Sequence, residues 1–198
     1  MIQLLLLFFA AWFGSPTQTY FEFLKKEVIV AYGDSSRYEY RVKQVRAESN
    51  FNPRATSDFK GWRKQKLDTV TAIRNNMGAA GLSQFIFATA ERYGANAVNT
   101  NAADENNYST DIYNPFWSLR SMCKYMKAID VFLIARTEPK VRARLISNRK
   151  FAEQCATASY NAGEGRVVKL LKKYATWDVM KYHLPAETRT YSNKIVKD

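Results

Sequence analysis

Apolar side chains recur at helical spacing through most of this chain, and this periodicity restricts the fold more than any other feature. The most complete stripe follows Pro115 and comprises Leu119, Met122, Cys123, Met126, Ile129 and Leu133. Apolar residues three and four positions apart form one face of an α-helix. Shorter stripes occupy residues 82–93, 151–159 and 167–174, and another helix is expected from about residue 36 to residue 48. Because strand signals are scarce, the sequence predicts a mainly α fold.

Glycine and proline mark the expected ends of these helices. Gly94 is predicted to end the helix over residues 82–93, and Gly163 and Gly165 to break the helix that begins near residue 151. Pro185 fits the first turn of a final helix. These signals divide the chain into short helices joined by turns.

Two segments have no clear periodicity. Residues 58–76 are rich in lysine and arginine, and residues 96–114 are polar and rich in asparagine. Long irregular segments in a compact domain often carry function. We therefore expect an insertion at 58–76 and a surface loop at 96–114.

The chain is strongly basic. Its 198 residues include 30 lysines and arginines against 18 acidic residues, which gives a net charge of +12. Such an excess predicts attraction to polyanions: a cell wall, an anionic membrane surface or nucleic acid. Because the basic residues are spread along the chain without a recognition motif, nucleic acid is not expected as a specific ligand.

Three short segments combine glycine, amide, hydroxyl and carboxyl side chains. They are Ala47-Glu48-Ser49-Asn50-Phe51-Asn52-Pro53, Gly78-Ala79-Ala80-Gly81-Leu82-Ser83-Gln84 and Ser159-Tyr160-Asn161-Ala162-Gly163. In this order they resemble the three active-site motifs of the lytic transglycosylases, which cut the glycan strands of peptidoglycan. A fourth segment, residues 184–191, resembles the C-terminal signature of that family. The resemblance covers about residues 37–194 and implies a lysozyme-like catalytic domain within residues 16–198.

The chemistry of glycosidic bond cleavage gives Glu48 a role. Cleavage requires an acid that protonates the leaving oxygen, and partial burial helps a carboxyl to remain protonated near neutral pH. Most glycosidases use two carboxylates, but the motifs offer one obvious candidate. The resemblance implies that Glu48 acts as acid and then as base, while the C6 hydroxyl of N-acetylmuramic acid attacks its own anomeric carbon. Hydrolysis by water, as in goose-type lysozymes, is the alternative.

The resemblance implies that the other motif residues bind substrate or support the site. They are Ser49, Gly81, Leu82, Gln84, Tyr160, Asn161, Glu187 and Tyr191. Gln84 and Asn161 would line the sugar cleft, and the Tyr160 hydroxyl would lie near the catalytic carboxyl. The chain departs from the family pattern at Ser83, where methionine is usual, and at Phe87, where proline is typical.

Other chemistries find little support. Cys123, Cys155 and His183 cannot assemble a zinc site, and the single histidine has no recognisable nucleophile. No phosphate-binding loop occurs, so neither a cofactor nor a metal is implied. The two cysteines are expected to be buried thiols, with a disulfide as the alternative. Three tryptophans are candidate sugar platforms, although each is more often a core residue: Trp62, Trp117 and Trp177.

The first fifteen residues form an apolar segment. Residues 2–13 are uncharged and too short to span a bilayer as a helix. They suit an atypical export signal, a membrane-surface anchor, or a segment that docks on a virion or envelope protein. We expect a phage virion protein that acts in the bacterial periplasm during genome ejection, or a bacterial periplasmic or inner-membrane-associated enzyme. A largely structural wall-binding component is the non-catalytic alternative.

Overall fold

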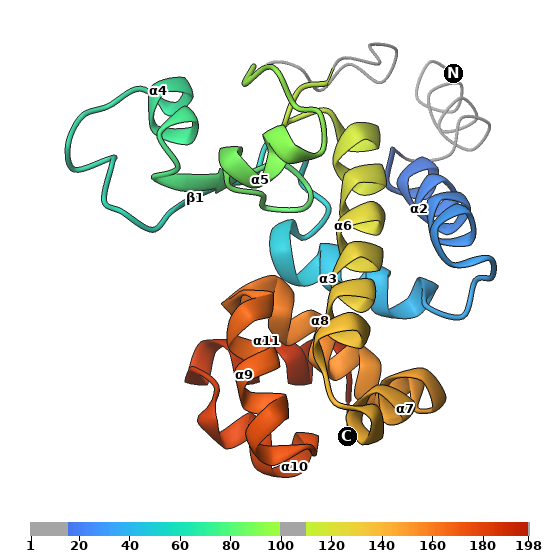
Figure 1. Cartoon of the computed structure of the whole chain (residues 1–198). Coiled ribbons are helices and arrows are strands. Elements are labelled where there is room, and N and C mark those ends of the chain that lie inside the picture. The colour runs from blue at the N-terminus through green and yellow to red at the C-terminus, as the bar shows by residue number, and fades with distance from the viewer. Residues whose placement is uncertain (1–15, 100–109, 198) are drawn as a thin grey trace. The chain divides into compact units, whose positions relative to one another are not determined.

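The computed structural model describes residues 16–99 and 110–197 (Figure 1). Most of the described chain is helical, which confirms the predicted fold class. The apolar segment 1–15 lies outside the described residues, as do residues 100–109 of the expected polar loop. Within the described ranges, no helix has the length and apolar character needed to cross a membrane.

The chain divides into two compact units, Met1–Ser121 and Met122–Asp198. In the described part, the first unit contains α2 (Pro16–Tyr32), α3 (Tyr38–Ser49), β1 (Thr56–Asp58), α4 (Thr69–Arg74), β2 (Gly78–Ala80), α5 (Phe87–Arg92) and the start of α6 (Pro115–Arg136). The second contains the rest of α6, α7 (Pro139–Ser147), α8 (Arg149–Ala162), α9 (Glu164–Tyr174), α10 (Trp177–Met180), the short 3-10 helix η1 (Lys181–His183) and α11 (Ala186–Ile195).

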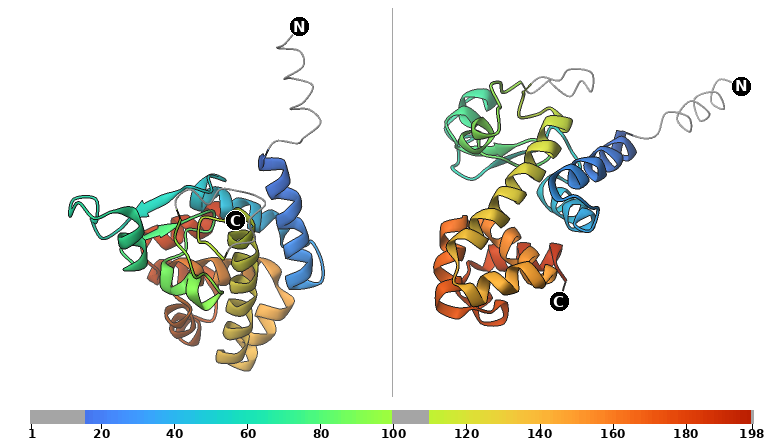
Figure 2. Two further views of the ribbon diagram at one scale, coloured as in Figure 1. Left: turned by 90° about the horizontal axis from the view of Figure 1, so that it is seen from above. Right: turned by 45° about the vertical axis from the view of Figure 1, so that its right-hand side comes forward.

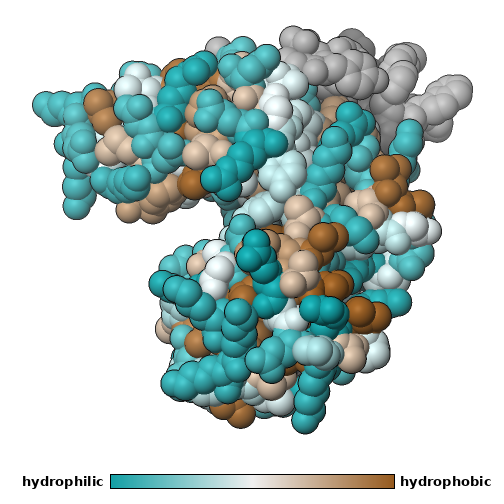
Figure 3. Space-filling view, viewed as in Figure 1, coloured by the Kyte–Doolittle hydropathy of each residue, from teal (hydrophilic) through white to brown (hydrophobic). Residues whose placement is uncertain are grey.

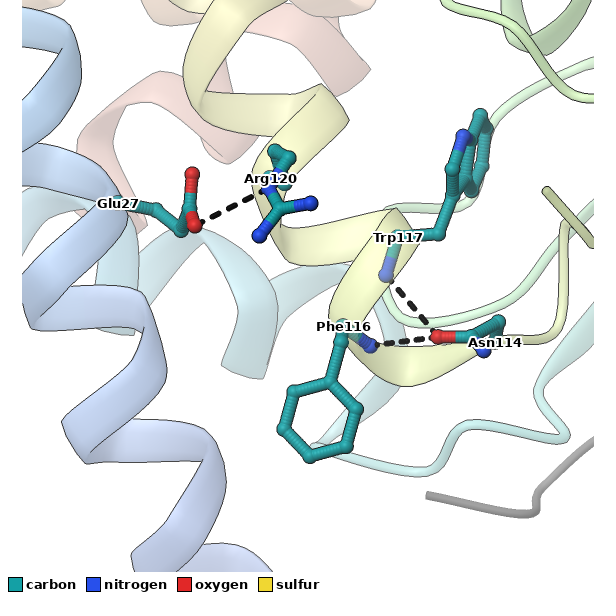
Figure 4. Close-up of polar contacts among 5 residues, drawn as sticks. All are labelled: Glu27, Asn114, Phe116, Trp117 and Arg120. Atoms are coloured by element: carbon teal, nitrogen blue, oxygen red, sulfur yellow. Dashed lines mark hydrogen bonds and ion pairs between the residues drawn. The ribbon is translucent and has the colours of Figure 1, made fainter. Parts of the chain in front are cut away.

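The helix α2 packs against α3 and reaches the beginning of α6. Figure 4 shows the ion pair that joins α2 to α6, in which Nε of Arg120 donates to Oε1 of Glu27 at 3.1 Å. The side-chain oxygen of Asn114 accepts from the backbone N–H groups of Phe116 and Trp117, both at 3.0 Å. Asn114 thereby satisfies two N–H groups in the first turn of α6 that have no partner within the helix. The start of α6 is therefore fixed by its own cap and by α2.

The two strands form a short antiparallel ribbon. Thr56 pairs with Ala80, and Asp58 pairs with Gly78. A Cβ atom added to Gly78 would lie 2.1 Å from the carbonyl oxygen of Ser57, so the strands approach too closely there for any other residue. Residues 59–77 connect the strands and include α4, whose Ala72 and Ile73 are fully buried.

The second unit is built around α8, which packs against α7, α9 and α11. Nine consecutive residues of α8, 151–159, are buried. The right-hand view of Figure 2 shows α7 to α11, coloured orange to red, gathered together. Cys123 on α6 and Cys155 on α8 are both buried thiols, as expected.

The structure corrects three expectations about where helices and irregular segments lie. The helix expected over residues 82–93 is limited to α5, because residues 82–86 form turns and extended backbone. Gly165 does not break a helix but lies in the first turn of α9, and Gly163 alone separates α8 from α9. The basic segment 58–76 is not wholly irregular, since it contains the end of β1 and all of α4.

Candidate active site

Glu48 lies in the last turn of α3, where its side chain is half-buried. Arg41, Gln44 and Val45 form the buried face of this helix, and Glu48 continues that face one turn further. Asn50, with φ of 51°, ends the helix in the left-handed conformation, and its N–H donates to the carbonyl of Arg46. Glu48 is therefore neither enclosed in the core nor fully exposed.

Ser49 joins the end of α3 to the glycine-rich segment. Its hydroxyl donates to the carbonyl of Leu82 at 2.9 Å, in preference to the longer contact of 3.2 Å with Val45 in its own helix. Ser49 is only 9% exposed, and Leu82 is fully buried. The first two motifs therefore meet inside the first unit. The buried Ser49–Leu82 hydrogen bond fixes the end of α3 against the glycine-rich segment.

Gln84 is oriented by two backbone carbonyl groups. Its Nε2 donates to the carbonyl of Ala55 at 3.0 Å and to that of Gly81 at 2.9 Å. The backbone N–H of Gly81 donates to the same Ala55 carbonyl at 3.0 Å. Since both amide hydrogens of Gln84 point to carbonyl oxygens, Oε1 is the atom left to accept a hydrogen bond from a ligand.

Gly81 is required at its position for two reasons. Its φ of 76° lies in the left-handed region, and an added Cβ would stand 2.2 Å from the carbonyl oxygen of Ile112. The turn that carries Gln84 therefore depends on a residue without a side chain.

Ser83 stands where the family pattern usually has methionine. Its side chain takes part in a buried hydrogen-bond network. Its hydroxyl donates to the carbonyl of Ser118 on α6 at 2.8 Å. The Ser118 hydroxyl donates in turn to Ser83 Oγ at 2.9 Å and accepts from the Ser83 backbone N–H at 3.0 Å. Both hydroxyl groups are thus satisfied in the core, where an unpaired one would be costly.

Phe87, the second departure, is the first residue of α5. Proline is favoured there because the N–H at this position has no partner within the helix. Phe87 is buried instead, and the guanidinium of Arg74 lies 5.3 Å from the centre of its ring. Compared with proline, Phe87 does not restrict the backbone at the start of α5, but its side chain contributes to the core.

The third motif belongs to the second unit, at the end of α8. Tyr160 is half-buried and its ring lies 5.4 Å from that of Tyr125. Asn161 is exposed, and its Oδ1 accepts a hydrogen bond of 2.6 Å from the hydroxyl of Thr188 on α11. Because Oδ1 faces Thr188, the amide hydrogens of Asn161 are the donors directed elsewhere.

Glu187 and Tyr191 lie on α11 of the same unit. Glu187 is exposed in its first turn and Tyr191 is half-buried. The Arg189 guanidinium, two residues after Glu187, lies 5.8 Å from the centre of the Tyr182 ring.

The candidate sugar platforms and the single histidine pack against other side chains. Trp62 and Trp177 are buried and cannot serve as surface platforms, and Trp117 is half-buried with its ring edge-on to Phe85. His183 stacks on Tyr174 with the ring centres 4.1 Å apart. Among the described residues, no group of three histidine, cysteine, aspartate or glutamate side chains could hold a metal ion.

Together these features define a mainly helical, lysozyme-like protein in which a half-buried glutamate at a helix end is joined to a glycine turn that positions a glutamine. The sequence model of the Transglycosylase SLT domain matches residues 31–182, and the chain belongs to this family. No curated protein and no solved structure gives a significant match. Family membership identifies a peptidoglycan-cleaving enzyme of the lytic transglycosylase type, with peptidoglycan as its substrate. The matched region ends before Glu187 and Tyr191.

Proposed function

We propose that this chain cleaves the glycosidic bond between N-acetylmuramic acid and N-acetylglucosamine in peptidoglycan and leaves a 1,6-anhydro-muramic end. The observation that carries this proposal is the joining of the first two motifs within one unit. Ser49 bonds to Leu82 at the end of the glutamate helix, and Gly81 and Gln84 both bond to the carbonyl of Ala55. This network fixes the end of the Glu48 helix relative to the Gln84 side chain.

In the proposed reaction Glu48 acts twice. Its carboxyl first donates a proton to the glycosidic oxygen as the bond from that oxygen to the anomeric carbon breaks. The resulting carboxylate then accepts the proton of the muramic C6 hydroxyl, whose oxygen forms the new bond to the anomeric carbon. No water is consumed, and the glutamate ends in the protonated state in which it began. A second carboxylate is unnecessary because the substrate supplies the nucleophile.

The proposed roles of the two motif amides follow from the hydrogen-bonding groups that each has left within its own unit. Gln84 offers Oε1 as an acceptor for a sugar hydroxyl or acetamide N–H, and Asn161 offers amide hydrogens as donors. The support of the carboxyl by Tyr160 stays a prediction from the family resemblance.

Mass spectrometry of the fragments released from purified peptidoglycan tests this proposal. Glu48→Gln keeps the size and hydrogen-bonding shape of the side chain but removes the transferable proton. We expect the rate to fall by about 10²- to 10⁴-fold, the usual contribution of general acid–base catalysis. Glu39→Gln is the matched control, because Glu39 is an exposed residue in the first turn of the same helix.

Each outcome has a distinct meaning. Anhydro-muramic ends that are lost only with Glu48→Gln support the proposed reaction. Reducing ends would mean that water is the acceptor and that the enzyme is a hydrolase of the goose-type lysozyme kind. Equal activity in Glu48→Gln and wild type would show that another residue is the acid. No release by the wild type would favour a structural wall-binding role.

For the biological setting we propose local opening of the cell wall, by a phage virion protein during genome ejection or by a periplasmic or inner-membrane-associated bacterial enzyme. The +12 charge suits an anionic wall. The apolar residues 2–13 are the proposed contact with a membrane or with neighbouring virion or envelope proteins. Recovery of the chain from host periplasm, cleaved near Ser15, would count against the virion assignment.

A further inference from the structure

The connection between β1 and β2, residues 59–77, forms a folded basic arm. It contains five basic residues and one acidic residue. In Figure 1 it extends outward from β1 toward α4, and the same region in Figure 3 is mostly hydrophilic. A simple turn would suffice to join two antiparallel strands, so the additional residues form a structure of their own.

The arm is held at its base by Asp58, Trp62 and Arg63. The carboxylate of Asp58 accepts from the backbone N–H groups of Trp62 at 2.9 Å and Arg63 at 3.1 Å. Desolvation alone would raise the pKa of Asp58, but these backbone donors outweigh it and hold the pKa below its usual value. The Trp62 ring is buried, and the Arg63 guanidinium lies 4.9 Å from its centre and donates to the Thr56 carbonyl.

This framework displays three lysines. Lys60, Lys64 and Lys66 are exposed, and within the described part of the chain none of their ammonium groups forms an ion pair. They lie within seven residues whose backbone is closed by successive turns, with Lys64 donating to Gly61 and Lys66 donating to Arg63. Three exposed lysines without an ion pair therefore project from one ordered stretch of seven residues.

The arm is connected to the candidate sugar-binding turn through one short segment. Arg63 bonds to the carbonyl of Thr56, and Gln84 bonds to the carbonyl of the preceding residue, Ala55. All four residues belong to the first unit, so the backbone of the arm and the Gln84 turn are parts of one compact structure. A glycan strand bound at Gln84 would therefore lie on the same compact unit as the arm.

We propose that Lys60, Lys64 and Lys66 bind the carboxylates of the peptides attached to the glycan strand, so that the arm selects peptide-bearing peptidoglycan. This inference rests on the proposed function, because it assumes that glycan is bound at Gln84. Anionic lipid and nucleic acid carry phosphate instead of carboxylate, and neither requires a connection between the arm and a sugar-binding residue.

A sedimentation binding assay with insoluble peptidoglycan tests the proposal. The full chain carries Glu48→Gln, so that the substrate is not consumed, and is compared with the same protein carrying Lys60→Gln, Lys64→Gln and Lys66→Gln. The peptidoglycan is free of attached phosphate polymers and is used either untreated or with its carboxylates capped by ethanolamine. The matched control changes three exposed lysines of the second unit: Lys169, Lys172 and Lys194.

We expect the arm variant to bind untreated peptidoglycan about 3- to 30-fold more weakly at low salt, as expected for three exposed ion pairs. It should bind capped peptidoglycan as the parent does, and its binding should be less sensitive to salt. The control variant should stay within about 2-fold of the parent, because scattered surface charges contribute little.

Three results would overturn the proposal. Equal losses in the arm and control variants would mean general charge attraction only. An arm effect of the same size on capped peptidoglycan would exclude the carboxylates. An arm effect larger on phosphatidylglycerol vesicles or duplex DNA than on peptidoglycan would assign the arm to phosphate. Because the assay measures binding without cleavage, it remains informative if Glu48 is not the acid or if the product is not an anhydro sugar.

Discussion

Replacing Gly81 by alanine tests whether the Gln84 turn depends on a close backbone approach. A non-glycine residue in the left-handed region costs about 1–2 kcal/mol. The lower entropy of the unfolded chain returns about 0.4–1 kcal/mol of this. Gly94 has a similar φ of 90° but no atom within 4 Å of an added Cβ, so Gly94→Ala should show only these two effects.

Gly81→Ala adds a collision to the same backbone cost. The new Cβ would lie 2.2 Å from the Ile112 carbonyl oxygen, whereas Cβ contacts below 3.0 Å are essentially never seen. Because the obstacle is backbone, it must move, and overpacking of this kind costs about 1–3 kcal/mol. For a chain of this size the difference corresponds to about 2–12 °C in melting temperature between the two variants.

Thermal unfolding followed by circular dichroism measures this difference, and glycan cleavage by the surviving folded protein measures its effect on the site. Gly81→Ala should melt well below Gly94→Ala and should lose activity through displacement of the Gln84 turn. Equal melting temperatures would refute the argument, because they would show that the Ile112 carbonyl can move away from the new Cβ without loss of stability.

Three further predictions concern single contacts. Ser83→Ala and Ser118→Ala should each destabilise the protein, and a double-mutant cycle in denaturant should give a coupling energy of about 1 kcal/mol; additive losses would contradict the network. Asn148→Ala removes the cap of α8 and should cost about 1 kcal/mol in the same assay, with Asn148→Asp close to wild type. The folded-state pKa of Asp58 lies below its unfolded value, so Asp58 stabilises the arm above about pH 4 and this contribution is lost as pH falls through the folded pKa. Hydrogen exchange of the Trp62 amide should therefore lose protection on acidification more in wild type than in Asp58→Asn, and the same loss in both would contradict the cap.

The long regular helices could be predicted from the sequence because their apolar stripes repeat over several turns. The stripe from Leu119 to Leu133 is buried throughout α6, and the one ending at Ser159 is buried in α8. The glutamate helix was predicted within one or two residues, since α3 spans Tyr38–Ser49. In α6 and α8 the residues of the predicted apolar stripe are therefore residues that the fold buries.

Residues 82–86 could not be predicted in this way, because burial there does not arise from a helix. Leu82 and Phe85 are buried at the expected spacing, but Gln84 has φ of 48° and Ile86 has extended backbone. Two tertiary contacts determine this conformation: the Gln84 amide bonded to Ala55, and the Ala80 N–H bonded to the Phe85 carbonyl. Neither contact leaves a periodic signal in the sequence.

The helix α2 was not predicted, although its sequence carries a helical pattern. Tyr20, Leu24, Glu27 and Val28 are its buried residues, at helical spacing. The motif residues themselves could be named from the sequence, but the hydrogen-bond orientation of Gln84 and the Ser83–Ser118 network required coordinates.

The position of α2 has a consequence for any attempt to reduce this enzyme to its family core. The matched region begins at residue 31, so nearly all of α2 lies before it. Phe51 has a left-handed backbone with φ of 60°, and its ring meets the Phe21 ring of α2 at 4.8 Å. Removing α2 would expose Phe51 beside the glutamate motif and leave Arg120 without Glu27. The family boundary therefore falls inside a helix of the first compact unit, and a shortened enzyme beginning there would retain every motif residue while losing part of what packs against them.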